Sequence, residues 1–271
     1  MATYLDRILA SHRALAATDD RDLDALADQA AAMPPARRFG TSLRLPHRLA
    51  VIAEVKRRSP SKPNLAPDLD PAAMASAYED GGASALSVLT DAEFFGGSPG
   101  DLRSARVATA LPVLRKDFTV GPGDVIDARM MGADAVLLIV AALDRAELAE
   151  LTRLATRVGL DALVEVHDEA EAEAALEAGA TIIGVNQRDL HTFEVDTDRA
   201  VRVAASLPPG CVRVAASGIT GPDDAERLAD AGFDAVLVGE SVVTATDPSG
   251  AVSSLLRRRV HARAARGPAG T

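Results

Sequence analysis

Short apolar runs alternate with amphipathic stretches along most of this chain. The apolar runs, each of strand length, comprise residues 50–55, 85–89, 112–118, 135–140, 162–166, 182–187, 212–217 and 235–239. Stretches with helical periodicity lie between them, most clearly at residues 71–80, 145–158, 169–177 and 223–230. Near-continuous apolar strands that alternate with amphipathic helices are typical of a parallel sheet covered on both faces. The pattern therefore predicts an α/β protein with eight parallel strands.

Glycine marks the ends of three helical stretches, in "EDGGAS", "EAGAT" and "DAGFDA". Glycine suits the left-handed backbone position that ends a helix before the next strand. Eight such units over about 190 residues fit a closed barrel better than an open sheet. No dinucleotide fingerprint (G-x-G-x-x-G) follows the first strand, which removes the commonest reason to prefer an open fold. We expect a single (β/α)8 TIM barrel with an N-terminal helical extension.

The barrel is expected to span residues 49–256, with different segments before and after it. Residues 1–48 are predicted to form helices over 5–16 and 22–32 and a "MPPARRFG" loop, packed over one mouth of the barrel. Residues 257–271, "RRRVHARAARGPAGT", form a basic tail, for which we expect a frayed helix end followed by a flexible terminus.

Composition narrows the class of protein and its partners. Of 271 residues, 48% are apolar and 25% are charged, which is typical of a soluble globular protein. The net charge of −10 argues against nucleic acid or an anionic membrane as the main partner. A single cysteine, Cys211, excludes an internal disulfide and fits a reducing compartment. With no signal-peptide pattern and no apolar run near the roughly 18 residues of a membrane helix, we expect a cytoplasmic location.

Charged and polar residues stand at the carboxyl ends of several strands, where the chemistry of a TIM barrel is expected. They are Glu54 and Lys56 at the first strand, Lys116 at the third, Glu165 at the fifth, and Asn186 and Arg188 at the sixth. A solvated residue just beyond a strand end explains any one of them equally well, but together they indicate one polar pocket. Two lysines and two carboxylates in one pocket offset each other's desolvation and keep their pKa values apart for acid–base chemistry.

The ends of the seventh and eighth strands, "ASGITGPDDAERL" and "VGESVV", carry a different signal. Their backbone N–H groups can hold a dianion, with the dipole of a following helix directed at it. The residues concerned are Ser217, Gly218, Gly239, Glu240 and Ser241. A phosphate site in these two loops recurs among barrel enzymes, and ordinary turn glycines are the alternative. The sequence predicts a phosphate-ester substrate.

The histidines and the cysteine carry weaker signals. The five histidines show no metal-ligand spacing, so we predict no metal, and His167 is expected to face outward beyond Glu165. Cys211 begins the seventh strand, at the end of a barrel that serves stability, which favours a structural thiol over a nucleophile. In an acidic chain, "KRRS" at 56–59 fits an anion-binding loop better than a nucleic-acid patch.

With these residues in place, the chain resembles the indole-3-glycerol phosphate synthase family, from about residue 5 to the last helix. The motifs that carry the resemblance are "IAEVKRRSPSK", "SVLTDAEFFGGS", "PVLRKDF", "GADAVLLIVAAL", "ALVEVHDEAE", "IIGVNQRDLHTFEVD", "SGI" and "DAVLVGES". The resemblance implies ring closure of 1-(2-carboxyphenylamino)-1-deoxyribulose 5-phosphate to indole-3-glycerol phosphate in tryptophan biosynthesis. This carbon–carbon lyase reaction releases CO2 and water and implies no cofactor; other tryptophan-pathway enzymes are candidate partners.

The resemblance also implies a role for each polar residue of the pocket. Lys116 would be the general acid that protonates the ketose carbonyl, and Glu165 the general base of the dehydration. Lys56, held by Glu54, would bind the substrate and could share the acid role, and Asn186 would hold the site together by hydrogen bonds. This agrees with the chemistry, because attack by an arene carbon needs a strongly polarised carbonyl.

The binding residues follow from the same resemblance. Arg188 and Ser59 would bind anionic groups, while Ser217, Gly218, Gly239 and the Glu240 amide would bind the phosphate. The apolar slot for the aromatic ring would be lined by Pro60, Phe95, Phe118, Leu137 and Leu190.

The chain departs from the family pattern in three places. Ala216, in "AASGI", stands where the family usually has glutamate, which removes one charge from the floor of the site. Pro63 replaces a usual glycine, and "GPGD" at 121–124 replaces a Pro-Tyr-Gln type of segment. A specialised paralogue that acts on a substituted anthranilate in secondary metabolism is therefore a second hypothesis.

Two rival activities fit the sequence less well. Phosphoribosylanthranilate isomerase uses a Cys/Asp acid–base design, and no cysteine ends the first strand here. Retention of Lys56, Lys116, Glu165 and Asn186 argues against a non-catalytic phosphate-binding paralogue, since a mere binder has no need of buried opposite charges that cost several kcal/mol each. Ala216 mildly favours such a paralogue. The sequence leaves open the pathway, the division of the acid role between the two lysines, and the oligomeric state.

Overall fold

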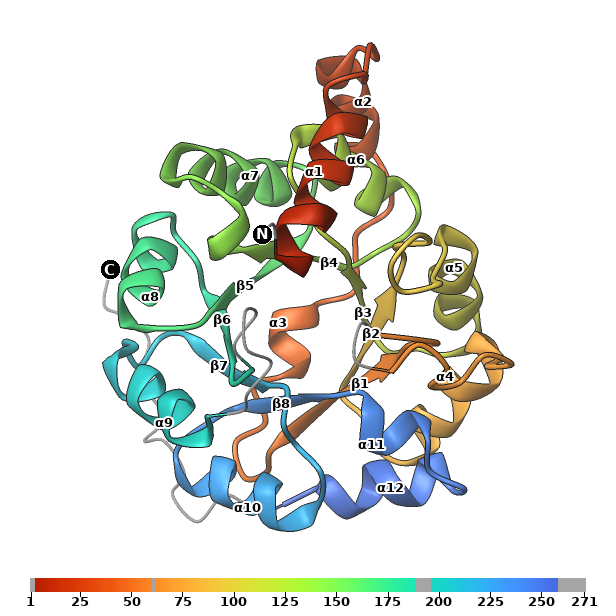
Figure 1. Cartoon of the computed structure of the whole chain (residues 1–271), viewed down its shortest axis with the longest axis vertical. Helices are drawn as coiled ribbons and strands as arrows, with labels where there is room; N and C mark the ends of the chain where they lie inside the picture. Colours follow the sequence, from red (N-terminus) through yellow and green to blue (C-terminus); the bar gives the residue numbers. More distant parts are fainter. Residues whose placement is uncertain (1–2, 60–61, 189–195, 258–271) are drawn as a thin grey trace.

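Eight parallel strands form a closed barrel in chain order, with β8 hydrogen-bonded to β1 (Figure 1). The computed structural model describes residues 3–59, 62–188 and 196–257. The strands are β1 (Ala50–Val55), β2 (Ala85–Leu89), β3 (Val113–Lys116), β4 (Ala135–Ile139), β5 (Asp161–Val166), β6 (Ile182–Asn186), β7 (Val212–Ala216) and β8 (Ala235–Val238). The predicted (β/α)8 TIM barrel with an N-terminal helical extension is confirmed.

Helices follow the strands and cover the barrel. They are α1 (Tyr4–Ala16), α2 (Leu23–Ala31), α3 (Phe39–Ser42), α4 (Pro71–Asp80), α5 (Pro99–Ala108), α6 (Pro122–Met130), η1 (Val140–Ala142), α7 (Arg145–Arg157), α8 (Glu169–Glu177), α9 (Thr197–Ser206), α10 (Pro222–Asp230), α11 (Glu240–Val243) and α12 (Pro248–Leu255). Proline at the first position begins α4, where Asp70 caps the free N–H groups. Beyond the ends of α4, α8 and α10, Gly82, Gly179 and Gly232 have φ of +87°, +87° and +89°, as the glycine motifs predict.

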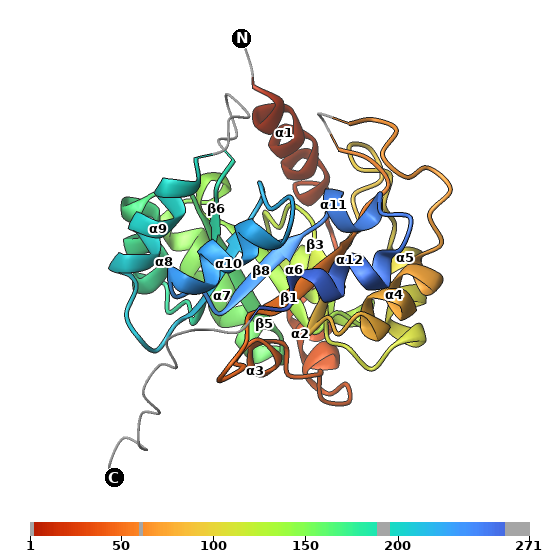
Figure 2. The same cartoon turned by 90° about the horizontal axis from the view of Figure 1, so that it is seen from below.

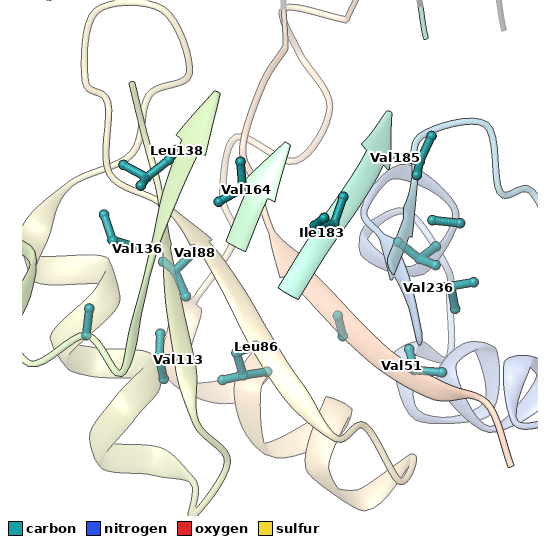
Figure 3. Packing of buried hydrophobic residues seen from close by; sticks show 14 of the residues in the cluster. Val51, Leu86, Val88, Val113, Val136, Leu138, Val164, Ile183, Val185 and Val236 are labelled. Atoms are coloured by element: carbon teal, nitrogen blue, oxygen red, sulfur yellow. The ribbon is translucent and has the colours of Figure 1, made fainter. Parts of the chain in front are cut away.

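Alternate residues of each strand enter two separate apolar layers. One layer lies between strands and helices, where residues such as Val88, Val136 and Ile183 pack together (Figure 3). The other fills the barrel lumen and includes Ile52, Leu114 and Leu163. Because side chains two apart in a strand point the same way, Glu54, Lys116 and Glu165 follow these three into the mouth of the barrel. The strand register therefore aims the charged residues at one place.

The N-terminal segment covers both mouths of the barrel, not one as predicted. α1 lies at the mouth formed by the carboxyl ends of the strands, and α3 lies at the opposite mouth (Figure 2). Phe39 of α3 and the adjacent Leu43 are fully buried in the lumen layer. The Gly40 N–H donates to Asp161 Oδ2, at the start of β5, at 2.8 Å. α3 therefore closes the mouth at the amino ends of the strands, which we call the barrel floor, while α1 lies at the mouth that holds the charged residues.

Two predictions about the ends of the chain stay predictions. One is the division of the chain into segments at residues 48 and 256. The other is the basic tail, of which residues 258–271 lie outside the described residues. Across the described ranges, none of the helices has both the length and the apolar character needed to cross a membrane.

Candidate active site

Glu54 and Lys56 form an ion pair inside the mouth of the barrel. The Lys56 ammonium lies 2.7 Å from Glu54 Oε1, and Glu54 is 4% exposed. Burial alone raises the pKa of the Glu54 carboxyl, but the charges of Lys56 and Lys116 outweigh it and hold the pKa below its ordinary value. Glu54 is therefore ionised at neutral pH and fixes the position of Lys56.

Ser87, in the middle of β2, also contacts this ion pair. Its hydroxyl donates to Glu54 Oε2 at 3.4 Å, and the residue is fully buried. The sequence interpretation missed Ser87. The signal was present, because a lone hydroxyl within the apolar run "ALSVL" needs a polar partner once it is buried.

Lys116, Glu165 and Asn186 meet at the same mouth from three different strands. Lys116 Nζ lies 3.9 Å from Glu165 Oε2. Asn186 Nδ2 donates to Glu165 Oε1 at 3.0 Å, while Asn186 Oδ1 accepts the Arg188 N–H at 3.0 Å. Since both ends of the amide are bonded, Asn186 holds Glu165 in one orientation. The structure thus brings together the ammonium and the carboxylate that the sequence assigned to acid and base.

Ala216 gives this mouth an apolar wall at the end of β7. Its Cα pairs in register with Asn186, and the residue is 6% exposed. It belongs to the lumen layer together with Leu237 of β8. The position where the family pattern has a carboxylate is therefore occupied by a methyl group beside the polar cluster.

The loop after β7 has an unusual backbone. Ser217 has φ of 67° and is the only non-glycine residue with positive φ in the described part of the chain, and Gly218 follows with φ of 69°. For a residue with a Cβ this conformation costs about 1–2 kcal/mol, so the surroundings must hold it. Gln187 does so, because its Nε2 donates to the Ser217 carbonyl at 2.8 Å. Gln187 was not among the sequence candidates.

The loop after β8 lies against both the ion pair and the loop after β7. A Cβ on Gly239 would lie 2.5 Å from Glu54 Oε1 and 3.0 Å from Lys56 Nζ, so a larger residue would have to displace the ion pair. Ser241 Oγ donates to the Ile219 carbonyl at 3.2 Å, which ties the two loops together. The predicted role of a helix dipole is weaker than expected, because α11 after Gly239 has only 4 residues.

The remaining predicted residues lie around this centre. Phe95 and Phe118 have ring centroids 6.2 Å apart with planes inclined by 33°, and Phe118 packs against the lumen layer that contains Leu137. Ser59 lies in the loop after β1, where its N–H donates to the Lys62 carbonyl at 2.9 Å. The Glu240 side chain pairs with Lys62, so its carboxylate contacts that loop. Pro60 and Leu190 lie outside the described residues.

Two histidines differ from the sequence interpretation. His12 of α1 lies with its Nε2 2.9 Å from Asp91 Oδ2 and 3.8 Å from Asp117 Oδ1, a contact that nothing in the local sequence predicts. His167 is more buried than the sequence interpretation implies, because its side chain is 12% exposed and its Nδ1 lies 3.0 Å from Glu171 Oε2 of α8. Helix α8 covers it, which the strand pattern alone does not reveal.

These features define a class of protein. It is a (β/α)8-barrel enzyme in which paired ammonium and carboxylate groups share one mouth with the loops after β7 and β8, an arrangement suited to acid–base chemistry. The chain belongs to the indole-3-glycerol phosphate synthase family, whose profile matches residues 5–255.

Curated relatives agree with this assignment over nearly the whole chain. An indole-3-glycerol phosphate synthase of Parafrankia sp. (strain EAN1pec) is 50% identical over 95% of this chain and 96% of its own length. That of Mycobacteroides abscessus is 50% identical over 96% of both chains. An indole-3-glycerol phosphate synthase 2 of Streptomyces coelicolor is 53% identical over 85% of this chain and 89% of its own length.

Solved structures of more distant proteins share the fold alone. A 3-hexulose-6-phosphate synthase from Salmonella typhimurium superposes with a TM-score of 0.62 at 16% identity, over 76% of this chain and 96% of that one. A thiamine phosphate pyrophosphorylase from Pyrococcus furiosus gives 0.59 at 20% identity, over 76% and 93%.

Proposed function

We propose that this protein is an indole-3-glycerol phosphate synthase, a carboxy-lyase that closes 1-(2-carboxyphenylamino)-1-deoxyribulose 5-phosphate into indole-3-glycerol phosphate. Membership of the family and 50% identity to named relatives support this activity. The observation that carries the proposal for the site is the approach of Lys116 Nζ to Glu165 Oε2, at 3.9 Å, in the mouth of the barrel. One group is suited to donate a proton and the other to accept one.

Lys116 acts in the first stage of the proposed reaction. The ring carbon that bears the carboxylate attacks the ketose carbonyl carbon, and Lys116 donates a proton to the carbonyl oxygen as the carbon–carbon bond forms. Loss of CO2 then returns the electron pair of the broken bond to the aromatic ring. Lys56, held 2.7 Å from Glu54 Oε1, binds the substrate oxygen beside it and is the second candidate for the acid.

Glu165 acts in the dehydration. The hydroxyl group leaves as water after it takes a proton from a lysine ammonium group. Glu165 removes a proton from the neighbouring carbon that is bound to nitrogen, which forms the second double bond of the five-membered ring. Asn186, bonded to Glu165 Oε1 at 3.0 Å, keeps the carboxylate directed at that carbon. Each step moves only protons and electron pairs of the substrate, so the reaction balances without a cofactor.

The substrate is bound at three places in this proposal. Amide groups of the loops after β7 and β8 bind the phosphate, at Ser217, Gly218, Gly239, Glu240 and Ser241. Arg188 and Ser59 bind the carboxylate end. The aromatic ring enters an apolar slot lined by Phe95, Phe118 and Leu137, with Pro60 and Leu190 from the segments outside the described residues.

Incubation of the purified protein with this substrate, followed by indole absorbance, tests the proposal. Turnover that disappears in Lys116→Ala and Glu165→Gln supports it. Phosphate-sensitive binding of the substrate without any indole product contradicts it and identifies a non-catalytic paralogue instead.

A second candidate is favoured by one observation, the methyl group of Ala216 where the family has a carboxylate. The apolar wall leaves space beside Asn186 for a substituent on the aromatic ring of the substrate. A higher kcat/KM for a substituted substrate than for the plain one supports this candidate. We also propose a cytoplasmic location, association with other tryptophan-pathway enzymes, and separate N-terminal, barrel and tail segments.

A further inference from the structure

Helix α1 is fastened to the functional mouth by three consecutive side chains. Ser11 donates to Glu93 in the loop after β2 at 2.9 Å, and Arg13 pairs with Glu147 of α7 at 2.8 Å. Both contacts are exposed to solvent. The middle contact, His12 to Asp91 at 2.9 Å, joins side chains that are only 14% and 5% exposed. Of these three polar contacts, that of His12 is therefore the buried one, and it anchors α1 together with the buried apolar side chains of Leu5 and Ile8.

Carboxylates from three elements surround the His12 imidazole. Asp91 follows β2, Asp117 follows β3, and Asp124 lies in α6. Arg115 of β3 bonds Asp117 Oδ2 at 2.9 Å, while Asp117 Oδ1 accepts the Phe118 N–H at 2.9 Å and lies 3.8 Å from His12 Nε2. A pocket of about 540 Å³ beneath α1 reaches the imidazole and is also lined by Asp19, Arg21, Glu93 and Asp127. The setting favours a protonated imidazole that solvent can still reach.

The same contacts determine where two aromatic rings lie. The His12 ring centroid is 5.8 Å from that of Phe118, which in turn is 6.2 Å from that of Phe95. Asp91 Oδ1 accepts the Phe95 N–H at 3.1 Å, so one carboxylate holds both His12 and the backbone of Phe95. Asp117, the other acidic neighbour, directly precedes Phe118 in the chain.

We propose that protonated His12 is a positioning residue for the aromatic ring of the substrate, because it fixes α1, Phe118 and the Phe95 loop as one wall of the slot. The inference rests on the proposed function, in which this slot receives the ring. When His12 loses its proton, attraction to the two aspartates is lost and the wall loosens. Affinity for the substrate then falls, while the acid and base, on other strands, continue to work.

The direction of the pH dependence follows from the charges. Burial alone lowers the pKa of His12, but the hydrogen bond to Asp91 and the charges of Asp117, Asp91 and Asp124 raise it above its ordinary value. The contribution of the ion pair is therefore complete below the ordinary imidazole pKa of about 6.5 and is lost as the pH rises through the raised value.

Steady-state kinetics between about pH 6 and pH 9, where an imidazole titrates, test the inference in wild type and His12→Gln. The neutral glutamine should raise KM about five-fold at the acid end, roughly what one lost aromatic contact removes from binding. The ratio of the two KM values should approach one as the pH rises. The kcat values, and the inhibition constant for inorganic phosphate, should be the same in both proteins.

Ser11→Ala is the matched control, since it removes a neighbouring α1 contact whose serine hydroxyl does not titrate in this pH range, and its KM ratio to wild type should not change with pH. A ratio for His12→Gln that is constant with pH overturns the inference. So does a phosphate inhibition constant that rises in parallel with KM, because α1 would then act as a general support.

The two hypotheses fail differently. Absence of turnover in wild type at every pH rejects the proposed function. In that event, amide hydrogen exchange of residues 4–16 still tests His12, by comparing wild type with His12→Gln at each pH. Faster exchange in the variant at the acid end, converging with wild type as the pH rises, supports the anchor, and equal exchange at all pH values overturns it.

Discussion

The two lysine–carboxylate pairs of this mouth, Lys116 with Glu165 and Lys56 with Glu54, differ in how closely their charged atoms lie. The charged atoms of Lys116 and Glu165 are 3.9 Å apart, farther than in the 2.7 Å pair of Lys56 and Glu54. A lysine held tightly by a carboxylate is a good fixed charge, whereas a lysine with a looser partner can turn towards a substrate oxygen. The distances therefore favour Lys116 as the acid and Lys56 as the binding residue.

Replacement of Lys116 by alanine tests this division. We expect kcat to fall by at least about 10²-fold, as the loss of a positioned general acid does, with thermal unfolding close to that of wild type. Lys56→Ala should instead affect KM and kcat together. Near-normal turnover of Lys116→Ala would move the acid role to Lys56.

A substitution at Ala216 tests which of the two candidate substrates is the natural one. If the plain substrate is the natural one, Ala216→Glu supplies a missing compensating charge beside the lysines and should raise kcat/KM about ten-fold, or about 1.4 kcal/mol. If the methyl group makes space for a ring substituent, the change should leave the activity on the plain substrate flat and abolish that on the substituted one. Kinetics of both proteins on both substrates separate these cases. A fast wild type slowed by the glutamate would show that the missing carboxylate is no defect.

At the scale of elements, the loops after β7 and β8 have separate tasks. The loop after β7 is held in its left-handed conformation by Gln187 and contains no residue of the charged cluster. The loop after β8 is pressed against that cluster through Gly239. In the proposed function, phosphate binding would therefore be coupled directly to the ion pair at the loop after β8, and only indirectly, through the Ser241–Ile219 bond, at the loop after β7.

Valine at Gly218 and alanine at Gly239 should therefore give different kinetics. Gly218→Val places a branched side chain at φ of 69° and should raise KM far more than it lowers kcat, as loss of a uniform binding contact does. Gly239→Ala should lower kcat as well, because its Cβ would lie 2.5 Å from Glu54 Oε1 and would push this carboxylate oxygen away. Equal KM and kcat profiles for the two variants, or a bound phosphate elsewhere in a crystal, would contradict the assignment of these loops.

The strand ends and turn glycines explain why the sequence predicts the elements so well. Each strand is a buried apolar run, and Gly82, Gly179 and Gly232 end helices with the left-handed backbone that only glycine adopts freely. The strand register then directs the side chains of Glu54, Lys116 and Glu165 into one mouth, so their grouping can be predicted from the sequence alone. Gln187 and His12 were missed because their roles depend on partners that only the folded chain brings together; Asp91, for example, is 79 residues from His12. Ser87 was missed although its isolated hydroxyl in an apolar strand was a visible signal.

At the scale of the whole molecule, the two mouths of the barrel serve different purposes. The mouth at the amino ends of the strands is closed by Phe39 and Leu43, which are fully buried against the lumen. Its polar contacts are structural, such as the hydrogen bond from the Gly40 N–H to Asp161. The mouth at the carboxyl ends of the strands carries the charged residues and α1. Changes at the floor should therefore alter stability and leave the chemistry intact.

Phe39→Ala tests this separation. Truncation of a fully buried phenylalanine costs about 3–5 kcal/mol of unfolding free energy, which denaturant titration measures. At a temperature where the variant is still folded, KM and kcat should be close to those of wild type. A large loss of kcat in folded Phe39→Ala would show that the floor also controls the geometry of the mouth.

The pairing of β1 with β8 has a consequence for how the cell makes this protein. The chain emerges from the ribosome with its N-terminus first, so β1 appears early. One edge of β1 then stays unpaired until β8, the last strand, has been synthesised. Gly239, which is pressed against the Glu54–Lys56 pair, also emerges only then. An interrupted nascent chain therefore has apolar strands exposed and no assembled mouth, and catalysis begins only after translation has passed β8.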